Sequence, residues 1–251
     1  RRQRQMCIRD RVKEMPFPEA VSQLTGTPLR AYTAPKAPVM PKERRLLLPD
    51  VDSSCDAVKA YLEGRGIHPE IIDYCIEKKL LFQTSQYKNA LFVGYDRMGK
   101  PHYGALRSTF SRFKSEATGS DKHYSFSIAE NPQADTVHLF EAAIDLLSYA
   151  TLEKYAGRDW KQEALLSLAG VFAPKRQGVV PVALSRFLEE HPQVTTLRLH
   201  LDNDEVGRAA AQGILDGLKG YTVLDEPPTR GKDVNEQLQL GLMKKKEEWE
   251  R

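Results

Sequence analysis

The sequence predicts an α/β fold with a compact parallel sheet, preceded by a smaller α+β block. From about residue 135 onward, short apolar segments alternate with longer segments of helical periodicity, an order typical of parallel strands joined by helices on both faces of a sheet. Acidic residues directly follow two of the apolar segments, at the sheet edge where α/β proteins bind ligands. We expect strands near residues 136–140, 165–169, 196–201 and 221–224, and helices near 142–156, 181–190, 205–218 and 233–248.

The α+β block is expected between residues 55 and 134. A helix over residues 57–67 contains glycine near its end, and a second helix follows over residues 69–79. Residues 90–107 then read as a strand, a turn and a return strand. Two helices followed by a hairpin indicate a small mixed subdomain in front of the parallel sheet.

Two aspartates separated by one residue follow the strand expected near residues 196–201. In an extended chain alternate side chains point to the same side, so Asp202 and Asp204 project together. Two carboxylates about 4 Å apart repel each other by ~4 kcal/mol at an effective dielectric constant of ~20. The pair therefore indicates a bound divalent cation. The alternative is that Asp202 is a turn residue and Asp204 the N-cap of the next helix.

Two further segments repeat the order of strand, acidic residue and helix. Glu141 directly follows the strand near residues 136–140, and Asp145 lies one helical turn beyond it, so both carboxylates can face one crevice. Near the end of the chain, a polar loop with Gly231, Lys232 and Asp233 opens the last helix.

These motifs resemble the Toprim domain, the metal-binding module shared by bacterial primases, topoisomerases and some nucleases. The resemblance covers about residues 135–249, within a domain expected over residues 135–251, and implies a compact sheet of about four parallel strands. Ala142 stands where the primase form commonly has glycine. The motifs that carry the resemblance are Glu141 with Asp145, Asp202-x-Asp204-x-x-Gly207, the Ser167–Val171 turn, and Gly231-Lys232-Asp233.

The block before residue 135 is similar to the amino-terminal part of a bacterial primase catalytic core. The similar features are a Tyr-Leu-x-x-Arg-Gly-Ile helix at residues 61–67, a hairpin, Arg107, and Lys122 beside an aromatic residue. The whole most resembles the primase-like Toprim proteins of conjugative and other mobile elements, plasmids among them.

The resemblance implies a site for Mg²⁺ or Mn²⁺, because carboxylates are hard ligands that suit these ions. Glu141, Asp202 and Asp204 are the expected catalytic residues and metal ligands, Asp145 belongs to the same metal set, and Asp233 is expected in the outer shell. Two alternatives remain: Glu141 acts as the general base for a primer hydroxyl, and Asp233 caps the last helix.

Cationic and aromatic residues are expected to bind the nucleotide and the nucleic acid. Lys122, Arg107 and Lys232 are the candidates, although Lys122 is alternatively a solvated loop lysine and Arg107 the partner of a carboxylate. His123 and Tyr124 are candidates for stacking on a base. The alternative for Tyr124 is a strand over residues 124–126 that packs inward.

The implied function is that of a metal-dependent nucleotidyltransferase that makes short RNA primers on single-stranded DNA during replication or transfer of a mobile element. The expected partners are the DNA template, nucleoside triphosphates, and a helicase or relaxase, with no membrane. The alternatives are phosphodiester cleavage of the Toprim nuclease or topoisomerase type, and a nucleic-acid-binding accessory role without catalysis.

Composition fits a cytoplasmic protein. No apolar run approaches the ~20 residues that cross a bilayer, and three scattered cysteines fit a reducing compartment and give no zinc site within the chain. The net charge of +3 comes from a basic tail over residues 1–14, part of which resembles translated sequencing-adapter read-through and is expected to be an artefact. Residues 15–54 are expected to hold a helix remnant and a Pro-rich linker, and the resemblance implies that a zinc-binding domain has been lost upstream.

Overall fold

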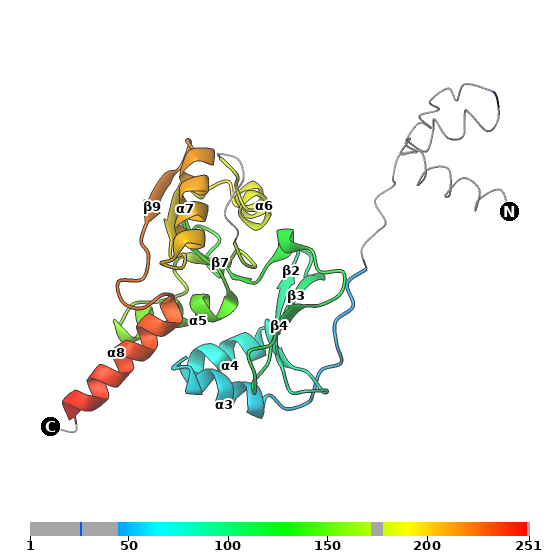
Figure 1. Cartoon of the computed structure of the whole chain (residues 1–251), viewed down its shortest axis with the longest axis vertical. Coiled ribbons are helices and arrows are strands. Elements are labelled where there is room, and N and C mark those ends of the chain that lie inside the picture. Colours follow the sequence, from blue (N-terminus) through cyan, green and yellow to red (C-terminus); the bar gives the residue numbers. More distant parts are fainter. Residues whose placement is uncertain (1–25, 27–44, 172–177, 250–251) are drawn as a thin grey trace. The chain divides into compact units, whose positions relative to one another are not determined.

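The computed structural model describes residues 45–171 and 178–249, together with Gly26 (Figure 1). Residues 44–251 form one structural unit. The expected basic tail, most of the expected Pro-rich linker and Cys7 lie outside the described residues.

The larger sheet has five strands, and its centre is formed by β6. All five residues of β6 are buried, as expected for a parallel strand covered on both faces. The expected set of four parallel strands is confirmed, and a two-residue strand that the sequence pattern did not predict pairs antiparallel with β7 at one edge. The order is β5-β7-β6-β8-β9, with bounds β5 (Ser127–Ile128), β6 (Thr136–Phe140), β7 (Ala164–Ser167), β8 (Thr196–Leu199) and β9 (Thr222–Asp225).

Helices cover both faces of this sheet, as expected (Figure 1). Successive residues of a strand point to opposite faces. Leu139 accordingly packs in the core beneath α6 and α7, whereas Phe140 packs on the other face with α5, and α8 lies against α5. The helices are α5 (Ala143–Tyr155), α6 (Val182–Glu190), α7 (Glu205–Gly217) and α8 (Val234–Trp249).

The preceding block has two helices and a four-stranded antiparallel sheet in sequence order. Its helices α3 and α4 bury Leu62 and Ile71 in a core that also contains Phe92, Phe126 and Leu147. That core is therefore continuous from the small sheet to α5. The elements are α3 (Asp56–Gly64), α4 (Pro69–Glu77), β1 (Leu81–Gln83), β2 (Ala90–Tyr95), β3 (Pro101–Arg107) and β4 (Lys114–Glu116).

A glycine sets the distance between the small sheet and the segment that leads into β5. A β-carbon at Gly94 in β2 would lie 1.7 Å from the backbone oxygen of Tyr124. Only glycine permits this approach. Tyr124 ends a short 3-10 helix, η1 (Lys122–Tyr124), so the expectation of a strand over residues 124–126 is wrong, although Phe126 is buried as expected.

Two further observations concern the described residues alone. None of their helices is both long enough and apolar enough to traverse a bilayer. Cys55 and Cys75 are free thiols, and Cys75 is buried in the core shared by α3, α4 and α5.

Candidate acidic active site

The two expected acidic motifs meet at one edge of the larger sheet. β6 and β8 are neighbouring parallel strands, with Leu139 opposite Leu199, so the residues that follow them emerge side by side. A β-carbon at Gly207 in α7 would lie 2.1 Å from the backbone oxygen of Asp202 and 3.0 Å from Oε1 of Glu141. The glycine thus lets the start of α7 close over both acidic residues.

Asp204 both caps a helix and faces a cation. Its Oδ1 accepts a hydrogen bond of 2.9 Å from the backbone N–H of Gly207, which makes it the N-cap of α7. Its Oδ2 lies 2.9 Å from Nζ of Lys232. The hydrogen bond from Gly207, followed by that from Lys232, lowers the pKa of Asp204, so the carboxylate is ionised at neutral pH.

Lys232 brings its ammonium group to both aspartates of the motif. Its Nζ lies 3.3 Å from Oδ2 of Asp202 as well as 2.9 Å from Asp204, and these contacts raise its pKa. The backbone N–H of Asn203 donates a 2.7 Å hydrogen bond to the carbonyl of Lys232, which holds the two loops together. In this structure Lys232 neutralises the acidic pair, and its expected role in nucleotide binding stays a prediction.

Glu141 carries an oxygen that lacks any hydrogen-bond partner. Oε1 is buried, and no described residue donates to it. Burial, followed by the charges of Asp202 and Asp204, raises the pKa of Glu141 to about 7; Lys232 acts in the opposite direction. An unpartnered buried acceptor costs free energy, so this geometry favours a bound positive group beside Glu141.

Asp145 lies behind this edge rather than on its surface. Its side chain is buried and accepts a 3.4 Å hydrogen bond from the backbone N–H of Asn235. Burial, followed by the charges of Asp233 and Asp202, raises the pKa of Asp145 to about 7. Asp233 accepts a 2.7 Å hydrogen bond from the N–H of Glu236, as the helix-capping alternative requires.

Two residues that sequence reasoning missed hold the acidic edge in place. Arg208 donates to the backbone carbonyls of Leu201 and Asp202, at 2.9 and 3.3 Å, and pairs with Asp225 at 2.7 Å. The fully buried side chain of Asn235 is the other. Asn235 links Asp145 to the small block, because its backbone N–H donates to Asp145 while its Nδ2 donates to Ser148 and to the carbonyl of Arg65. Asn235 acts through contacts distant in sequence, whereas Arg208 binds carbonyls six and seven residues before it but has no motif that marks this role.

The acidic set suits Mg²⁺ or Mn²⁺ in its chemistry. All of its donors are carboxylate oxygens, which these ions prefer. The unpartnered oxygen of Glu141 and the ammonium of Lys232 between Asp202 and Asp204 both indicate a place where positive charge is stabilised. Within the described residues, no three acidic, histidine or cysteine side chains already converge as a ready metal site. A divalent ion would therefore have to share or displace the Lys232 contacts.

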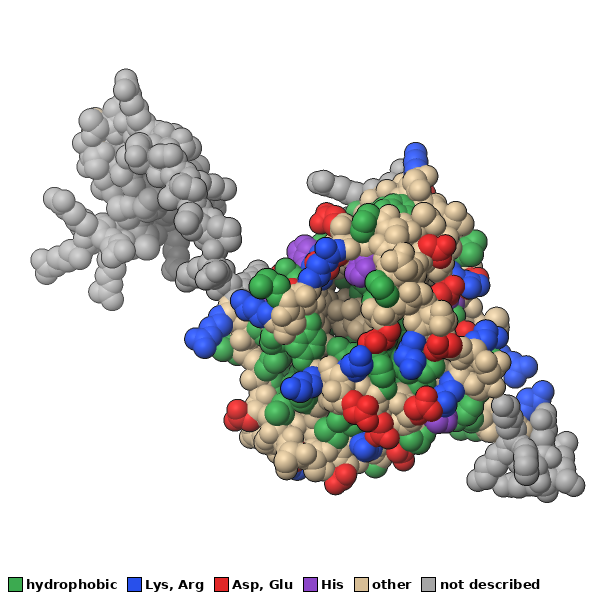
Figure 2. Space-filling view, turned by 180° about the vertical axis from the view of Figure 1, so that it is seen from behind, with side chains coloured by type: hydrophobic (Ala, Val, Ile, Leu, Met, Phe, Trp, Pro, Cys, Tyr) green, Lys and Arg blue, Asp and Glu red, His purple; other side chains and the backbone are tan. Residues whose placement is uncertain are grey.

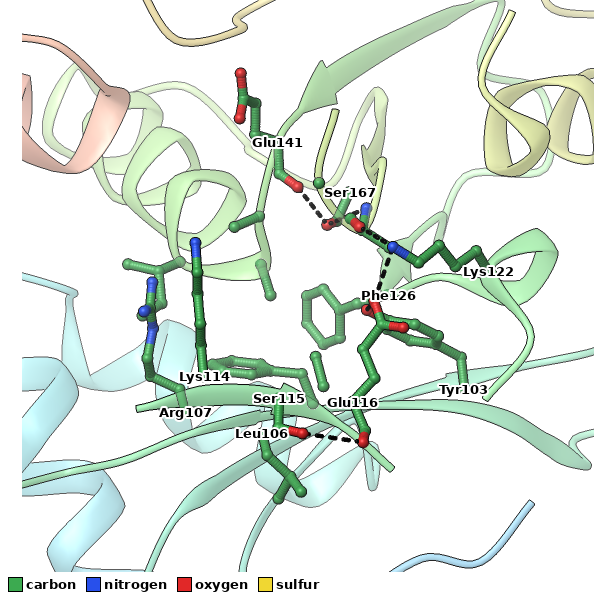
Figure 3. A pocket seen from close by; sticks show the side chains of 17 residues that line it. Tyr103, Leu106, Arg107, Lys114, Ser115, Glu116, Lys122, Phe126, Glu141 and Ser167 are labelled. Carbon is green, nitrogen blue, oxygen red and sulfur yellow. Dashed lines mark hydrogen bonds and ion pairs between the residues drawn. The ribbon is translucent and has the colours of Figure 1, made fainter. Parts of the chain in front are cut away.

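A cavity of about 450 Å³ adjoins the acidic edge and is lined by cations from the small block. Figure 3 shows Arg107 and Lys114 rising from β3 and β4, while Lys122 reaches in from the other side. Lys122 donates to the carbonyl of Ala169 at 2.9 Å and lies 3.0 Å from Glu116, so it is not a free loop lysine. Figure 2 shows a hollow on one face of the molecule with Lys and Arg side chains along its rim.

Lys114 is a cation of this cavity that sequence reasoning missed. It lies directly opposite Arg107 in the β3–β4 ladder, and neither side chain forms an ion pair with any described residue. The sequence gives only a weak indication that Lys114 belongs to the site, because lysines on short exposed strands are common. The alternative of a carboxylate partner for Arg107 is thus not met within the described part of the chain.

The aromatic candidates differ from each other. The ring of Tyr124 stacks on His102, with centroids 4.2 Å apart, and the guanidinium of Arg186 lies 3.6 Å from its centroid. Tyr124 therefore already has partners within the protein. His123 is exposed, with Nδ1 2.6 Å from Oδ1 of Asp121.

Two family models match the chain. Residues 138–238 match a model described as Toprim-like, and residues 60–132 match one described as a protein of unknown function (DUF3991). An uncharacterized protein of Bacillus anthracis, from the plasmid pXO2, is 30% identical over 172 residues, which are 65% of this chain and 48% of that protein. The chain therefore spans about half the length of this relative.

Solved structures share the fold. The primase fragment of the bacteriophage T7 primase-helicase protein is similar with a TM-score of 0.52 and 18% identity, over 74% of this chain and 71% of that one. The DnaG catalytic core is similar with a TM-score of 0.51 and 12% identity, over 79% of this chain and 74% of that one. At these identities the likeness concerns the fold.

Proposed function

Since the chain contains a Toprim-like domain and has the fold of primase catalytic cores, we propose that it is a metal-dependent nucleotidyltransferase that makes short RNA primers on single-stranded DNA. The plasmid-borne relative supports a role in the replication or transfer of mobile elements. Such a role would place the protein in the cytoplasm, with a helicase or relaxase as its partner.

One observation carries this proposal. The acidic edge and the cationic cavity adjoin, because Glu141 belongs to both: it follows β6 at the acidic edge and also lines the cavity with Arg107, Lys114 and Lys122. Phosphoryl transfer needs both parts. Carboxylates hold divalent cations, and lysine and arginine bind the phosphates and the nucleic-acid backbone.

The acidic residues have two kinds of role in the proposed mechanism. Glu141, Asp202 and Asp204 would hold Mg²⁺ or Mn²⁺, which when bound neutralises phosphate charge and polarises the reacting oxygens. Asp145 and Asp233 fix the surrounding loops, Asp145 by accepting from Asn235 and Asp233 by capping α8. The alternative role of Glu141 is that of a general base for a primer hydroxyl in place of a metal ligand, and its raised pKa in the metal-free protein suits that role.

The cations on the cavity wall would bind the nucleotide and the template. Arg107 and Lys114 stand on adjacent strands with no carboxylate partner among the described residues, so their charges are available to phosphates. Lys122 is held at the opposite wall by Glu116 and Ala169. There it would contact the triphosphate of an incoming nucleotide.

Primer synthesis tests the proposal. The protein is incubated with single-stranded DNA, labelled ribonucleotides and Mg²⁺ or Mn²⁺, in parallel with Asp202→Asn and with Glu189→Gln as an exposed acidic control. We expect labelled oligoribonucleotides from the parent and the control and none from Asp202→Asn. A parent that cleaves labelled DNA and incorporates no nucleotide would overturn priming in favour of Toprim-type cleavage. A parent with neither activity would favour an accessory role.

A further inference from the structure

The loop between β3 and β4 displays two aromatic side chains to solvent. Phe110 is 79% exposed and Phe113 is 53% exposed, although aromatic residues are usually at least half-buried. Both lie within residues 108–113, the turn that joins Arg107 to Lys114. Two exposed phenylalanines on one short turn give it an unusually large exposed apolar surface, which indicates a binding role.

The loop is ordered by its own hydrogen bonds. Ser108 Oγ accepts from the backbone N–H groups of Phe110 and Ser111, at 3.2 and 3.1 Å, and the N–H of Ser108 donates to the carbonyl of Phe113 at 3.0 Å. Thr109 Oγ1 also donates to the carbonyl of Lys88 at 3.1 Å, which ties the loop to the turn before β2. The aromatic rings are thus presented by a braced turn.

The charge of this segment is entirely positive. Residues 107–114, Arg-Ser-Thr-Phe-Ser-Arg-Phe-Lys, contain three cationic residues and no acidic residue. Arg107, Arg112 and Lys114 make no ion pair with any residue in the described part of the chain. Cationic side chains without ion-pair partners, interleaved with exposed aromatic rings, complement a nucleic-acid strand, which offers both phosphates and bases.

The segment is continuous with the cationic cavity. Arg107 and Lys114 form the last pair of the β3–β4 ladder and line the cavity beside Glu141. The loop that carries Phe110 and Phe113 extends directly from this pair. A strand leaving the cavity past Arg107 and Lys114 would therefore meet the two rings next.

We propose that the β3–β4 loop is a docking surface for single-stranded nucleic acid, on which bases stack against Phe110 and Phe113 while Arg107, Arg112 and Lys114 bind the phosphates. This inference rests on the proposed function in that the bound strand is the template. Bases stack on aromatic side chains with little sequence preference, so the surface suits a template of any sequence.

Equilibrium binding of a fluorescein-labelled oligothymidylate, followed by anisotropy, tests the surface. We expect Phe110→Ala and Phe113→Ala each to weaken binding by about 5- to 100-fold, and Phe110→Trp to retain it. Met98→Ala is the matched control, because Met98 is 93% exposed on the β2–β3 turn at the other end of the small sheet. Its affinity should equal that of the parent.

The salt dependence of binding separates stacking from phosphate contact. Arg112→Gln and Lys114→Gln should each reduce the slope of log affinity against log salt by about one unit, whereas the phenylalanine variants should leave the slope unchanged. Thermal melts confirm that each variant is folded.

The inference and the proposed function fail in different ways. Asp202→Asn should bind oligothymidylate like the parent, because it leaves the loop intact. If both phenylalanine variants bind like the parent, the inference is overturned whether or not the protein makes primers, and the loop then serves another partner such as a protein. If the variants lose binding while the parent makes no primers, the docking surface stands and the priming activity does not.

Discussion

Nζ of Lys232, on the loop before α8, lies 3.3 Å from Oδ2 of Asp202, which follows β8. The same ammonium group lies 2.9 Å from Asp204. A lysine thus supplies the positive charge that the two carboxylates need. A divalent cation at this edge would meet a positive group already in place, so the protein carries its own competitor for the metal.

Replacing Lys232 should separate its neutralisation of the two aspartates from its competition with the metal. Without metal, Lys232→Gln leaves Asp202 and Asp204 facing each other unneutralised, and we expect a lower melting temperature by about 2–4 °C. With the competing charge removed, Mg²⁺ should bind roughly three- to tenfold more tightly. Differential scanning calorimetry and metal titration measure the two quantities.

Lys219→Gln is the control for this prediction, because Lys219 is exposed and makes no ion pair with a described residue. It should change neither the melting temperature nor the affinity. Weaker Mg²⁺ binding by Lys232→Gln would instead show that the lysine helps to hold the ion.

The raised pKa of Glu141 predicts a specific pH dependence for the metal-free protein. A carboxyl whose pKa rises on folding stabilises the folded state fully below its unfolded pKa, near 4.5, and this stability is lost as pH rises through about 7. Glu141→Gln cannot ionise. Its melting temperature should match that of the parent near pH 4.5 and exceed it by about 2–6 °C at pH 8. The difference is smaller than the full pKa shift implies, because solvent screens the half-buried carboxylate.

Melting curves across this range, with Glu189→Gln as an exposed control, measure the effect. If the difference in melting temperature between Glu141→Gln and the parent stays constant from pH 4.5 to 8, Glu141 does not titrate in this range.

Gly207 should tolerate no side chain. In Gly207→Ala the new β-carbon would meet the backbone of Asp202 at 2.1 Å, so α7 must shift away from both acidic residues. We expect a loss of about 1–3 kcal/mol in the free energy of unfolding, together with weaker metal binding.

Gly241→Ala in α8 is the matched control, and its expected change in the free energy of unfolding has the opposite sign. A β-carbon there meets no atom within 4 Å. Alanine should stabilise the helix by about 0.5–1 kcal/mol. Urea denaturation measures both variants, and equal stabilities would contradict the close packing of α7 on Asp202.

The acidic edge could be predicted from the sequence because its determinants are local. β6 is fully buried and β8 alternates buried and half-buried residues, a carboxylate follows each of them closely, and adjacent parallel strands end at one edge. Glu141 and Asp202 therefore follow from the pattern once the strands are recognised. Asp204 forms the N-cap that one alternative expects, because one oxygen accepts from Gly207; its other oxygen faces Lys232, and its role as a metal ligand stays a prediction.

What could not be predicted depends on contacts between residues distant in sequence. β5 has two residues, too few for a periodic pattern, and exists through its pairing with β7. The place of Lys232 beside Asp202 depends on how the last loop closes over β8. Lys114 becomes a cavity residue only because β4 pairs with β3 opposite Arg107.

At Tyr124 a local side-chain hydrogen bond favours a turn over the expected strand. Asp121 accepts from the backbone N–H of His123 at 3.1 Å and so starts a 3-10 turn where a strand was expected.

Binding of Mn²⁺ to the metal-free protein, measured by isothermal titration calorimetry, tests most directly whether Glu141, Asp202 and Asp204 form one cation site. The account predicts binding by the parent and by Glu189→Gln, and a loss of more than about tenfold in affinity for Glu141→Gln and for Asp202→Asn separately. Equal affinity in all four proteins, or no binding by the parent, would contradict a metal site at this edge of the sheet.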